Sequence, residues 1–457
     1  MAPPLPAERA RPRLRPPTLA RCAATNQFNA VNHRPAHRAA LRHSVALVLL
    51  ALAGAGSQAQ TAAPAAAASA PTGPTVRAEI AVPLQAAREL ITNKKGKDAL
   101  PKLAEAEAMP GVTNYENYVI ARLRGVAALD AGDHPLALAA FERALASEYL
   151  PAADRTALLD GAARLAIELK DYPRAIGLLT RYKDAGGSDP ALRRILPQVM
   201  AETGDHASAV RESLLLVQAD DAAGRGSAEN LLRNLGYSQN KLGDTAGYVA
   251  TIERLAVQYP KTDYFADLIG RVERRPGFNS ERLRLDVYRL QRAVGLELEP
   301  AELADMASRA LQAGLPGEAQ ALADEGFSAG VLGKGKDAAL HQQLRQQIQK
   351  AAAQDLKSLP DSEKSAQASK EGNALVNLGF AVSGMGQHDK ALALTAEGIA
   401  RGGLRRPDEA QLHLALAQWR AGRKDDALRS FEAVKGGDGA TDLARVWALF
   451  IKSAAKR

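Results

Sequence analysis

From about residue 78 onward, apolar residues recur with the period of an α-helix, and short breaks of glycine, aspartate and proline separate the helical stretches. No stretch shows the strict alternation of a convincing β-strand. Each break holds a glycine followed by a polar residue that can cap the next helix, as at 131–134 (AGDH), 203–206 (TGDH) and 421–424 (AGRK). The pattern therefore predicts an all-α chain of helices paired across tight turns.

A packing position after these turns recurs along the chain. It falls at Ala99, Ala137, Ala175, Ala209, Tyr248, Ala319, Ala391 and Ala427, with gaps of 38, 38, 34, 39, 71, 72 and 36 residues. The two long gaps each equal about two periods, so each is expected to contain one less regular hairpin. One is predicted at 263–297, and the other at 337–370, where a long helix is expected to stop near Pro360. The count is about ten hairpins, and 441–455 is predicted to be a capping helix.

These hairpins resemble tetratricopeptide repeats, which are units of 34 residues that pair two antiparallel helices. The clearest unit spans 229–262, with Leu235-Gly236 on its first helix, Gly243 at the turn and Pro260 as terminator. The resemblance extends to units at 118–151, 372–406 and 408–440, and it implies a right-handed superhelical solenoid. We expect an N-terminal array at 78–262, degenerate middle repeats at 263–370, and C-terminal repeats with the capping helix at 371–457.

The net charge of +8 lies almost entirely in the first 59 residues, which hold eight arginines and one glutamate. The remainder has 51 basic and 50 acidic side chains (59 − 8 and 51 − 1), so no excess charge is left to neutralise nucleic-acid phosphates. The sole cysteine, Cys22, also lies in that segment, which excludes a disulfide framework or a cysteine zinc site in the rest of the chain.

The same N-terminal segment has the features of a signal peptide. Residues 45–56 form an apolar run, arginines precede it, and Ser57-Gln58-Ala59 supplies small residues for cleavage after Ala59. We therefore interpret 1–59 as a targeting segment and 60–77 as a disordered Ala/Pro linker. This predicts a periplasmic or secreted protein. An uncleaved signal-anchor and a transit peptide are the alternatives.

The chemistry suggested by single motifs is weak. Residues 330–337 (GVLGKGKD) match part of a phosphate-binding loop, but Asp337 replaces the Ser or Thr that would hold magnesium. His134, His206 and His388 share one turn position in three different repeats, which argues against a common metal. We predict no cofactor, no metal and no enzymatic activity. A hydrolase on a helical scaffold stays a weaker alternative, which requires two carboxylates converging in one pocket.

The resemblance places ligand-binding residues on the first helix of each repeat, facing a concave groove. The candidates carried onto this chain are Arg122, Arg164, Arg194, Gln198, Arg233, Tyr237, Asn240 and Lys241, followed by Asn373, Phe380, Trp419 and Arg420. Asp160 interrupts the arginine row, so the alternative is a set of ordinary solvated helix residues. A basic cluster at Arg271, Arg274, Arg275, Arg282 and Arg284 has acids interleaved, which favours a solvated face over a partner site.

These inferences predict a non-enzymatic, exported scaffold that binds a protein or peptide in its groove and acts in envelope assembly or export. The alternative function is a structural adaptor held at the inner membrane by an uncleaved signal-anchor. No nucleic-acid partner is expected.

Overall fold

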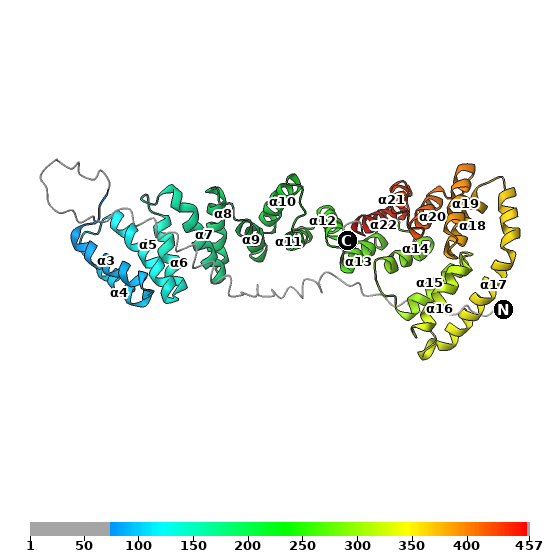
Figure 1. Cartoon of the computed structure of the whole chain (residues 1–457), viewed down its shortest axis with the longest axis horizontal. Helices are drawn as coiled ribbons and strands as arrows, with labels where there is room; N and C mark the ends of the chain where they lie inside the picture. The colour runs from blue at the N-terminus through cyan, green and yellow to red at the C-terminus, as the bar shows by residue number, and fades with distance from the viewer. Residues whose placement is uncertain (1–73, 455–457) are drawn as a thin grey trace, which may run out of the picture. The chain divides into compact units, whose positions relative to one another are not determined.

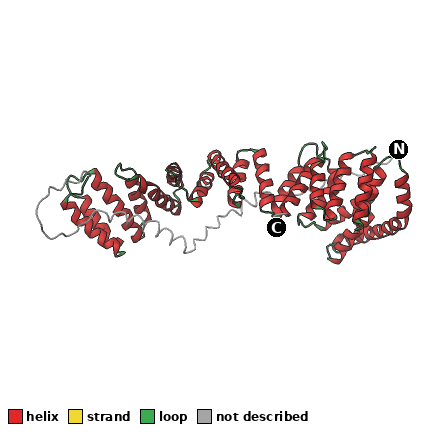
Figure 2. Ribbon diagram, turned by 45° about the horizontal axis from the view of Figure 1, so that its top comes forward, coloured by secondary structure: helices red, strands yellow, loops and turns green. Residues whose placement is uncertain are grey.

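The computed structural model describes residues 74–454, and all of the regular structure in that range is helical (Figure 2). It contains twenty α-helices and one short 3-10 turn, η1 (Gly335–Asp337). The predicted all-α class and the paired-helix architecture are therefore confirmed. The predicted targeting segment, its cleavage site at Ala59 and most of the predicted linker lie outside the described residues.

The described residues form two compact units, 74–248 and 249–454. The first contains α3 (Ala78–Thr92), α4 (Gly96–Glu107), α5 (Asn114–Ala131), α6 (His134–Leu145), α7 (Ala152–Glu168), α8 (Tyr172–Asp184), α9 (Pro190–Glu202), α10 (His206–Ala222) and α11 (Glu229–Lys241). The helix α12 (Thr245–Gln258) spans the boundary. In this unit each helix packs on the next, so the hairpins stack in chain order (Figure 1).

The turns of this unit follow the predicted pattern. Gly132 ends α5 with φ of 78°, in the left-handed region, and the carboxylate of Asp133 then accepts a hydrogen bond from the Leu136 N–H at 3.1 Å. Gly204 and Asp205 repeat this arrangement before α10. The turn after α7 lacks glycine, and Lys170 takes the left-handed conformation there with φ of 58°. A glycine is therefore favoured at these turns but is not required.

Arg77, the last residue of the predicted linker, is fixed to the folded unit. Its backbone N–H and its guanidinium both donate to the carboxylate of Glu116, at 2.9 and 3.0 Å. Glu116 is fully buried and also closes a capping box with Thr113 at the start of α5. The amino end of α3 is thus tied to the second hairpin through one carboxylate.

Two glycines within helices give opposite predictions for stability. A Cβ added at Gly125 in α5 would lie 2.2 Å from the Phe141 ring of α6, whereas one at Gly177 in α8 would meet nothing within 4 Å. We expect Gly125→Ala to destabilise the protein by about 1–3 kcal/mol through overpacking. Gly177→Ala is expected to stabilise it by about 0.5–1 kcal/mol through helix propensity. Urea denaturation of both variants checks this, and equal effects of the same sign would contradict it.

The second unit contains α13 (Thr262–Glu273), α14 (Ser280–Ala293), α15 (Pro300–Gln312), α16 (Pro316–Ser328), α17 (Ala338–Ala368), α18 (Asn373–Gly384), α19 (His388–Arg401), α20 (Pro407–Arg420), α21 (Lys424–Glu432) and α22 (Ala440–Ala454). The less regular hairpin predicted at 263–297 is present as α13 and α14, with a turn at 274–277 between them. The predicted capping helix corresponds to α22.

The expectation that a helix stops near Pro360 is wrong. α17 continues without interruption for 31 residues and ends at Ala368, with Pro360 inside it. Proline in a helix interior costs one backbone hydrogen bond, so something must hold the helix beyond it. Leu359 and Ala366 supply that packing, because both are buried in one apolar cluster with Leu375 and Val382 of α18.

The last helix of this unit returns to the first ones. α22 packs against α13 and α14 (Figure 1), and the Phe265 and Phe450 rings meet edge to face at 5.9 Å between centroids. The loop before α22 adds a backbone hydrogen bond of 2.8 Å, which Asn279 N–H donates to the Asp438 carbonyl. The contacts therefore connect the two ends of the 262–454 segment.

An arginine at this junction binds three acids from distant parts of the chain. The guanidinium of Arg282, whose side chain is 11% exposed, bonds to Asp438 at 2.6 and 2.8 Å, to Asp408 at 2.9 Å and to Glu409 at 3.2 Å. We call these four residues the Arg282 cluster. Arg275 likewise pairs with Asp442. The interpretation of the middle arginines as a solvated face is thus wrong for Arg282, whose partners lie more than 120 residues away.

Candidate functional site

The predicted arginine row of the first unit lies against carboxylates. Arg122 is 7% exposed, and its Nη1 donates to the Tyr118 hydroxyl at 2.8 Å and to Asp154 Oδ2 at 3.0 Å. Asp154 belongs to the first turn of α7, so the pair links the first helices of two successive hairpins. Arg122 therefore has a structural role, because it connects α5 to α7.

The same arrangement recurs in the next hairpins. Arg164 of α7 pairs with Asp160 on its own helix and with Asp189, the N-cap residue of α9. Arg194 of α9 lies 3.9 Å from the buried carboxylate of Asp220, which Arg225 also contacts at 2.7 Å. The positive charges of the arginines are thus paired with aspartates along this row. That the row also binds an anionic ligand stays a prediction.

The remaining candidates of the first unit gather on α11. Arg233, Tyr237, Asn240 and Lys241 are spaced by four, three and one residues, which places them on one side of the helix. We call these four residues the α11 face. The Tyr237 ring meets His206 edge to face at 5.5 Å and lies 5.4 Å from Lys241 Nζ. Arg233, Asn240 and Lys241 are exposed, and Gln198 on α9 is half-buried.

Two candidates in the second unit lie in internal contacts. The Asn373 amide donates to the Gly403 carbonyl at 2.9 Å, and its oxygen accepts from the Arg405 N–H at 3.0 Å, which holds the loop after α19. Phe380 is 1% exposed and stacks flat on the His413 ring, with centroids 3.9 Å apart. Their proposed role in ligand contact is untested.

Arg420, the last candidate, belongs to a buried ion cluster. Arg289 of α14 donates to Glu318 of α16 through Nε and Nη2, at 2.9 and 2.7 Å, and to Asp286 at 2.6 Å. Arg420 of α20 donates through Nη2 to the same Glu318 at 2.9 Å. Both guanidiniums also lie over the Phe380 ring, at 4.8 and 5.2 Å. Helices α14, α16, α18 and α20 meet at this cluster.

The electrostatics of the cluster are asymmetric. Burial raises the pKa of Glu318, but Arg289 and Arg420 outweigh it and hold that pKa at about 2. Burial lowers the pKa of Arg289, yet Glu318 and Asp286 outweigh it and raise that pKa above its ordinary value. The pKa of Arg420 is lowered, because burial and repulsion from Arg289 exceed the attraction of the shared Glu318. Arg420 is therefore the cation with the least compensation.

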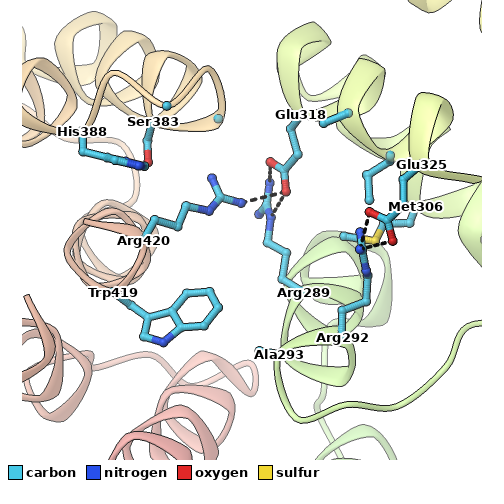
Figure 3. A pocket seen from close by; sticks show the side chains of 14 residues that line it. Arg289, Arg292, Ala293, Met306, Glu318, Glu325, Ser383, His388, Trp419 and Arg420 are labelled. Atoms are coloured by element: carbon cyan, nitrogen blue, oxygen red, sulfur yellow. Dashed lines mark hydrogen bonds and ion pairs between the residues drawn. The ribbon is translucent and has the colours of Figure 1, made fainter. Parts of the chain in front are cut away.

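A pocket of about 450 Å³ opens beside this cluster (Figure 3). Figure 3 shows Arg289, Glu318, Arg292 and Glu325 on one side and Arg420 with Trp419 on the other, and Arg292 pairs with Glu325 at 2.7 Å. Ser383 and His388 line it from α18 and α19, and Trp419, Met306 and Leu322 provide apolar surface. Side chains from α14, α15, α16, α18, α19 and α20 thus form one concave site within the 249–454 unit.

A family model described as "Tetratricopeptide repeat" matches residues 231–262 and 409–436. The two matches coincide with α11–α12 and with α20–α21, which are two of the hairpins predicted from the sequence. The chain contains tetratricopeptide repeats.

Three solved structures resemble the chain at low identity. The structure of Naa15/Naa10 bound to HypK-THB has 15% identity and a TM-score of 0.25, and the match covers 82% of this chain and 72% of that chain. Yeast Tom70 has 12% identity and a TM-score of 0.23, with coverage of 83% and 96%. The TPR domain of P58(IPK) has 13% identity and a TM-score of 0.20, with coverage of 83% and 100%. No curated protein matches the chain.

The predicted equivalence of three histidines across different hairpins is confirmed. His134, His206 and His388 are the first residues of α6, α10 and α19. Among residues 74–454 no group of three or more histidine, cysteine or acidic side chains is placed to hold a metal ion. None of the helices described in that range is long and apolar enough to cross a bilayer.

The glycine-rich segment 330–337 is an inter-repeat loop, and the element before it is α16 rather than a strand. Gly330, Gly333 and Gly335 have positive φ, and the Gly333 N–H donates to His341 Nδ1 at 3.2 Å. Glu297 and Glu299 line the hollow beside this loop, together with Lys334 and Lys336. Acidic side chains at this place disfavour a phosphate.

Sequence reasoning missed the partners that make the pocket. Arg289 and Asp286 occur within an otherwise apolar-periodic stretch, LRLDVYRL at 283–290. Charges three residues apart inside a buried helical stripe were the available signal, because buried charges must be paired. Nothing in the local sequence indicated that Arg289 pairs with Glu318, or that Arg420, 102 residues from Glu318, bonds to the same carboxylate.

Proposed function

We propose that this tetratricopeptide-repeat protein is a non-enzymatic scaffold, exported to the cell envelope, that binds a protein or peptide partner in assembly or export. The observation that carries the proposal is the α11 face, which belongs to one of the two hairpins matched by the family. It combines a tyrosine ring with an exposed arginine, two residue types that are enriched at interfaces.

Three features support this part of the protein as the contact surface. Tyr237 is half-buried against His206, so its ring is held in place before any partner arrives. Lys241 and Asn240 are exposed beside it and can bond to a peptide backbone or an acidic side chain. Stacked hairpins extend this surface along neighbouring first helices, including the half-buried Gln198.

The predicted test is a pull-down after mild crosslinking from separated envelope and cytosolic fractions, with the intact chain as bait. The double variant Tyr237→Ala/Lys241→Ala is expected to lose partner recovery about tenfold, as for an interface hot spot. The control, Lys102→Ala/Arg211→Ala, changes exposed residues elsewhere in the same unit and should retain the partner. Equal recovery by both variants would rule out the α11 face.

Arg122 and Arg194 are unsuitable for this test. Arg122→Ala would strip a buried contact from Asp154 and Tyr118, and Arg194→Ala would change the surroundings of the buried Asp220. A lost partner would then report a damaged repeat stack rather than lost recognition.

The mass of the same bait tests the export part. The apolar run at 45–56 and the Ser-Gln-Ala site support cleavage, so mature protein from the envelope fraction should begin at Gln60. Envelope protein that retains 45–56 would favour the second candidate, an inner-membrane adaptor. Recovery solely from the cytosol with 1–59 intact would reject export.

A further inference from the structure

We propose that the pocket beside Arg420 binds the carboxylate of a small ligand whose apolar part packs on Trp419. The pocket has a volume of about 450 Å³, within the range of sites that hold small molecules. The proposal concerns the 249–454 unit alone and depends neither on export nor on the α11 face.

Three residues that line the pocket each carry a buried polar atom with no hydrogen-bond partner among the described residues: Nη1 of Arg420, Oγ of Ser383 and Nδ1 of His388. Each of these atoms is buried, and Ser383 as a whole is 2% exposed. Buried polar groups are normally bonded, so three such atoms on residues of one pocket lining point to a ligand that completes them. Figure 3 shows Arg420 extending between Glu318 on one side and, on the other, Ser383 near the end of α18 and His388 at the start of α19.

The nature of these atoms selects an anion. Nη1 of a guanidinium can only donate, and the serine hydroxyl and a protonated imidazole nitrogen can donate as well. A carboxylate offers two acceptor oxygens and about four lone-pair directions, which suits donors that come from different helices. α19 begins at His388, so its amino end adds partial positive charge at the same place.

The hydrogen bonding of the ion cluster next to the pocket is incomplete at one guanidinium, that of Arg420. Arg289 directs three nitrogens to two carboxylates, whereas Arg420 directs one nitrogen to a carboxylate that it shares. An additional carboxylate on Nη1 would give Arg420 a partner on each terminal nitrogen. Arg292 does not compete for it, because its Nη2 lies 2.7 Å from both oxygens of Glu325.

The apolar part of the ligand follows from the other walls. Trp419, Met306, Leu322 and Ala293 line the pocket, and the Trp419 ring is held by Trp447 at 4.9 Å between centroids. A compact ring or branched chain next to the carboxylate would therefore be buried with it. Such a group occurs both in free organic acids and in the last residue of a peptide with a free carboxyl end.

Calorimetric titration of the full chain tests the proposal and separates these two sources. The free-acid arm compares phenylacetate with its neutral analogue phenylacetamide. The peptide arm compares acetyl-Ala-Phe with its C-terminal amide. We expect the acids to bind and the amides to bind at least about tenfold more weakly, because each charge-assisted bond outweighs a neutral one. Binding by phenylacetate assigns a free acid, and binding by the dipeptide acid alone assigns a chain end.

Two variants locate the binding. Arg420→Lys keeps a positive charge near Glu318 but removes the second guanidinium nitrogen, and Ser383→Ala removes one hydroxyl. Each change should lower the affinity for the acid by about tenfold. Arg423→Lys is the matched control, since Arg423 is three residues away, 54% exposed and paired with Asp389 outside the pocket. Thermal unfolding of each variant separates lost binding from lost folding.

The proposal is overturned by any of three results in folded protein. These are no heat of binding by any acid up to millimolar concentration, equal affinity for acid and amide, or unchanged affinity in both Arg420→Lys and Ser383→Ala. If one of these results occurs while the partner still depends on the α11 face, the scaffold proposal stands and the pocket proposal fails.

Discussion

Replacing Glu318 with alanine is expected to destabilise the 249–454 unit by about 3–5 kcal/mol. The change removes the carboxylate that Arg289 and Arg420 share and leaves two buried guanidiniums side by side over Phe380. Breaking a buried ion pair costs more than the pair contributes, because the remaining charge stays desolvated. Urea denaturation followed by tryptophan fluorescence measures the loss in unfolding free energy, since Trp419 and Trp447 both lie in this unit.

Glu325→Ala is the matched control for this prediction. Glu325 is on the same helix and pairs with Arg292, but its side chain is 58% exposed, so its loss should cost less than about 1 kcal/mol. Similar losses for the two variants would show that the Glu318 cluster contributes no more than a surface pair.

The pH dependence of the same unit follows from the pKa of Glu318. Its folded-state pKa is about 2, below the ordinary value of 4.5, so the unfolded state binds the proton more readily. The stabilisation is fully present above about pH 4.5 and is lost as the pH falls from there towards 2. A Glu318→Gln variant should be less stable at neutral pH and should lose less stability across this range.

Replacing Arg282 with alanine is expected to release the α22 end from α13 and α14, at a cost of about 2–4 kcal/mol. Asp408, Glu409 and Asp438 would then face one another without their shared cation. The pKa of Asp438, which is held below its ordinary value mainly by the hydrogen bond from Arg282, should rise towards that value. Hydrogen exchange should show early opening of α22 and of the loop at 434–439.

Arg445→Ala provides the comparison at the same junction. Arg445 bonds to Glu253 at 2.6 Å, but its side chain is 65% exposed, so we expect little change in exchange or in unfolding free energy. If Arg282→Ala leaves the exchange of α22 at the wild-type rate, apolar contacts such as Phe265 with Phe450 hold the junction without the Arg282 cluster.

Local sequence predicted the helices, the turns and the hairpin period because each depends on residues close together in the chain. Gly132 and Asp133 specify one turn by themselves, and the spacing from Ala137 to Ala175 reflects one repeat. The end of α17 was predicted wrongly because it depends on packing between helices and not on nearby residues alone. Packing of Leu359 and Ala366 against the next helix outweighs the local preference of Pro360.

The candidate site was only partly visible from the sequence. The resemblance to tetratricopeptide repeats placed Arg122, Tyr237 and Arg420 on first helices, but it could not show which acids they meet. The partners of Arg282 and Arg420 lie 126 and 102 residues away, and no local pattern encodes such a pairing. Burial of a charge is decided by tertiary packing, which is why the pairing of Arg289 with Glu318 became evident in the structure alone.

The return of α22 to α13 also affects the order in which the protein folds during synthesis. In the 74–248 unit each hairpin packs on its chain neighbours, so it can settle as soon as the next one emerges. The contact between Asn279 and Asp438 instead closes a segment of about 160 residues and cannot form until nearly the whole chain has been made. A nascent chain stopped before α22 therefore holds a folded first array and an unclosed second unit, in which Phe265 lacks its contact with the Phe450 ring.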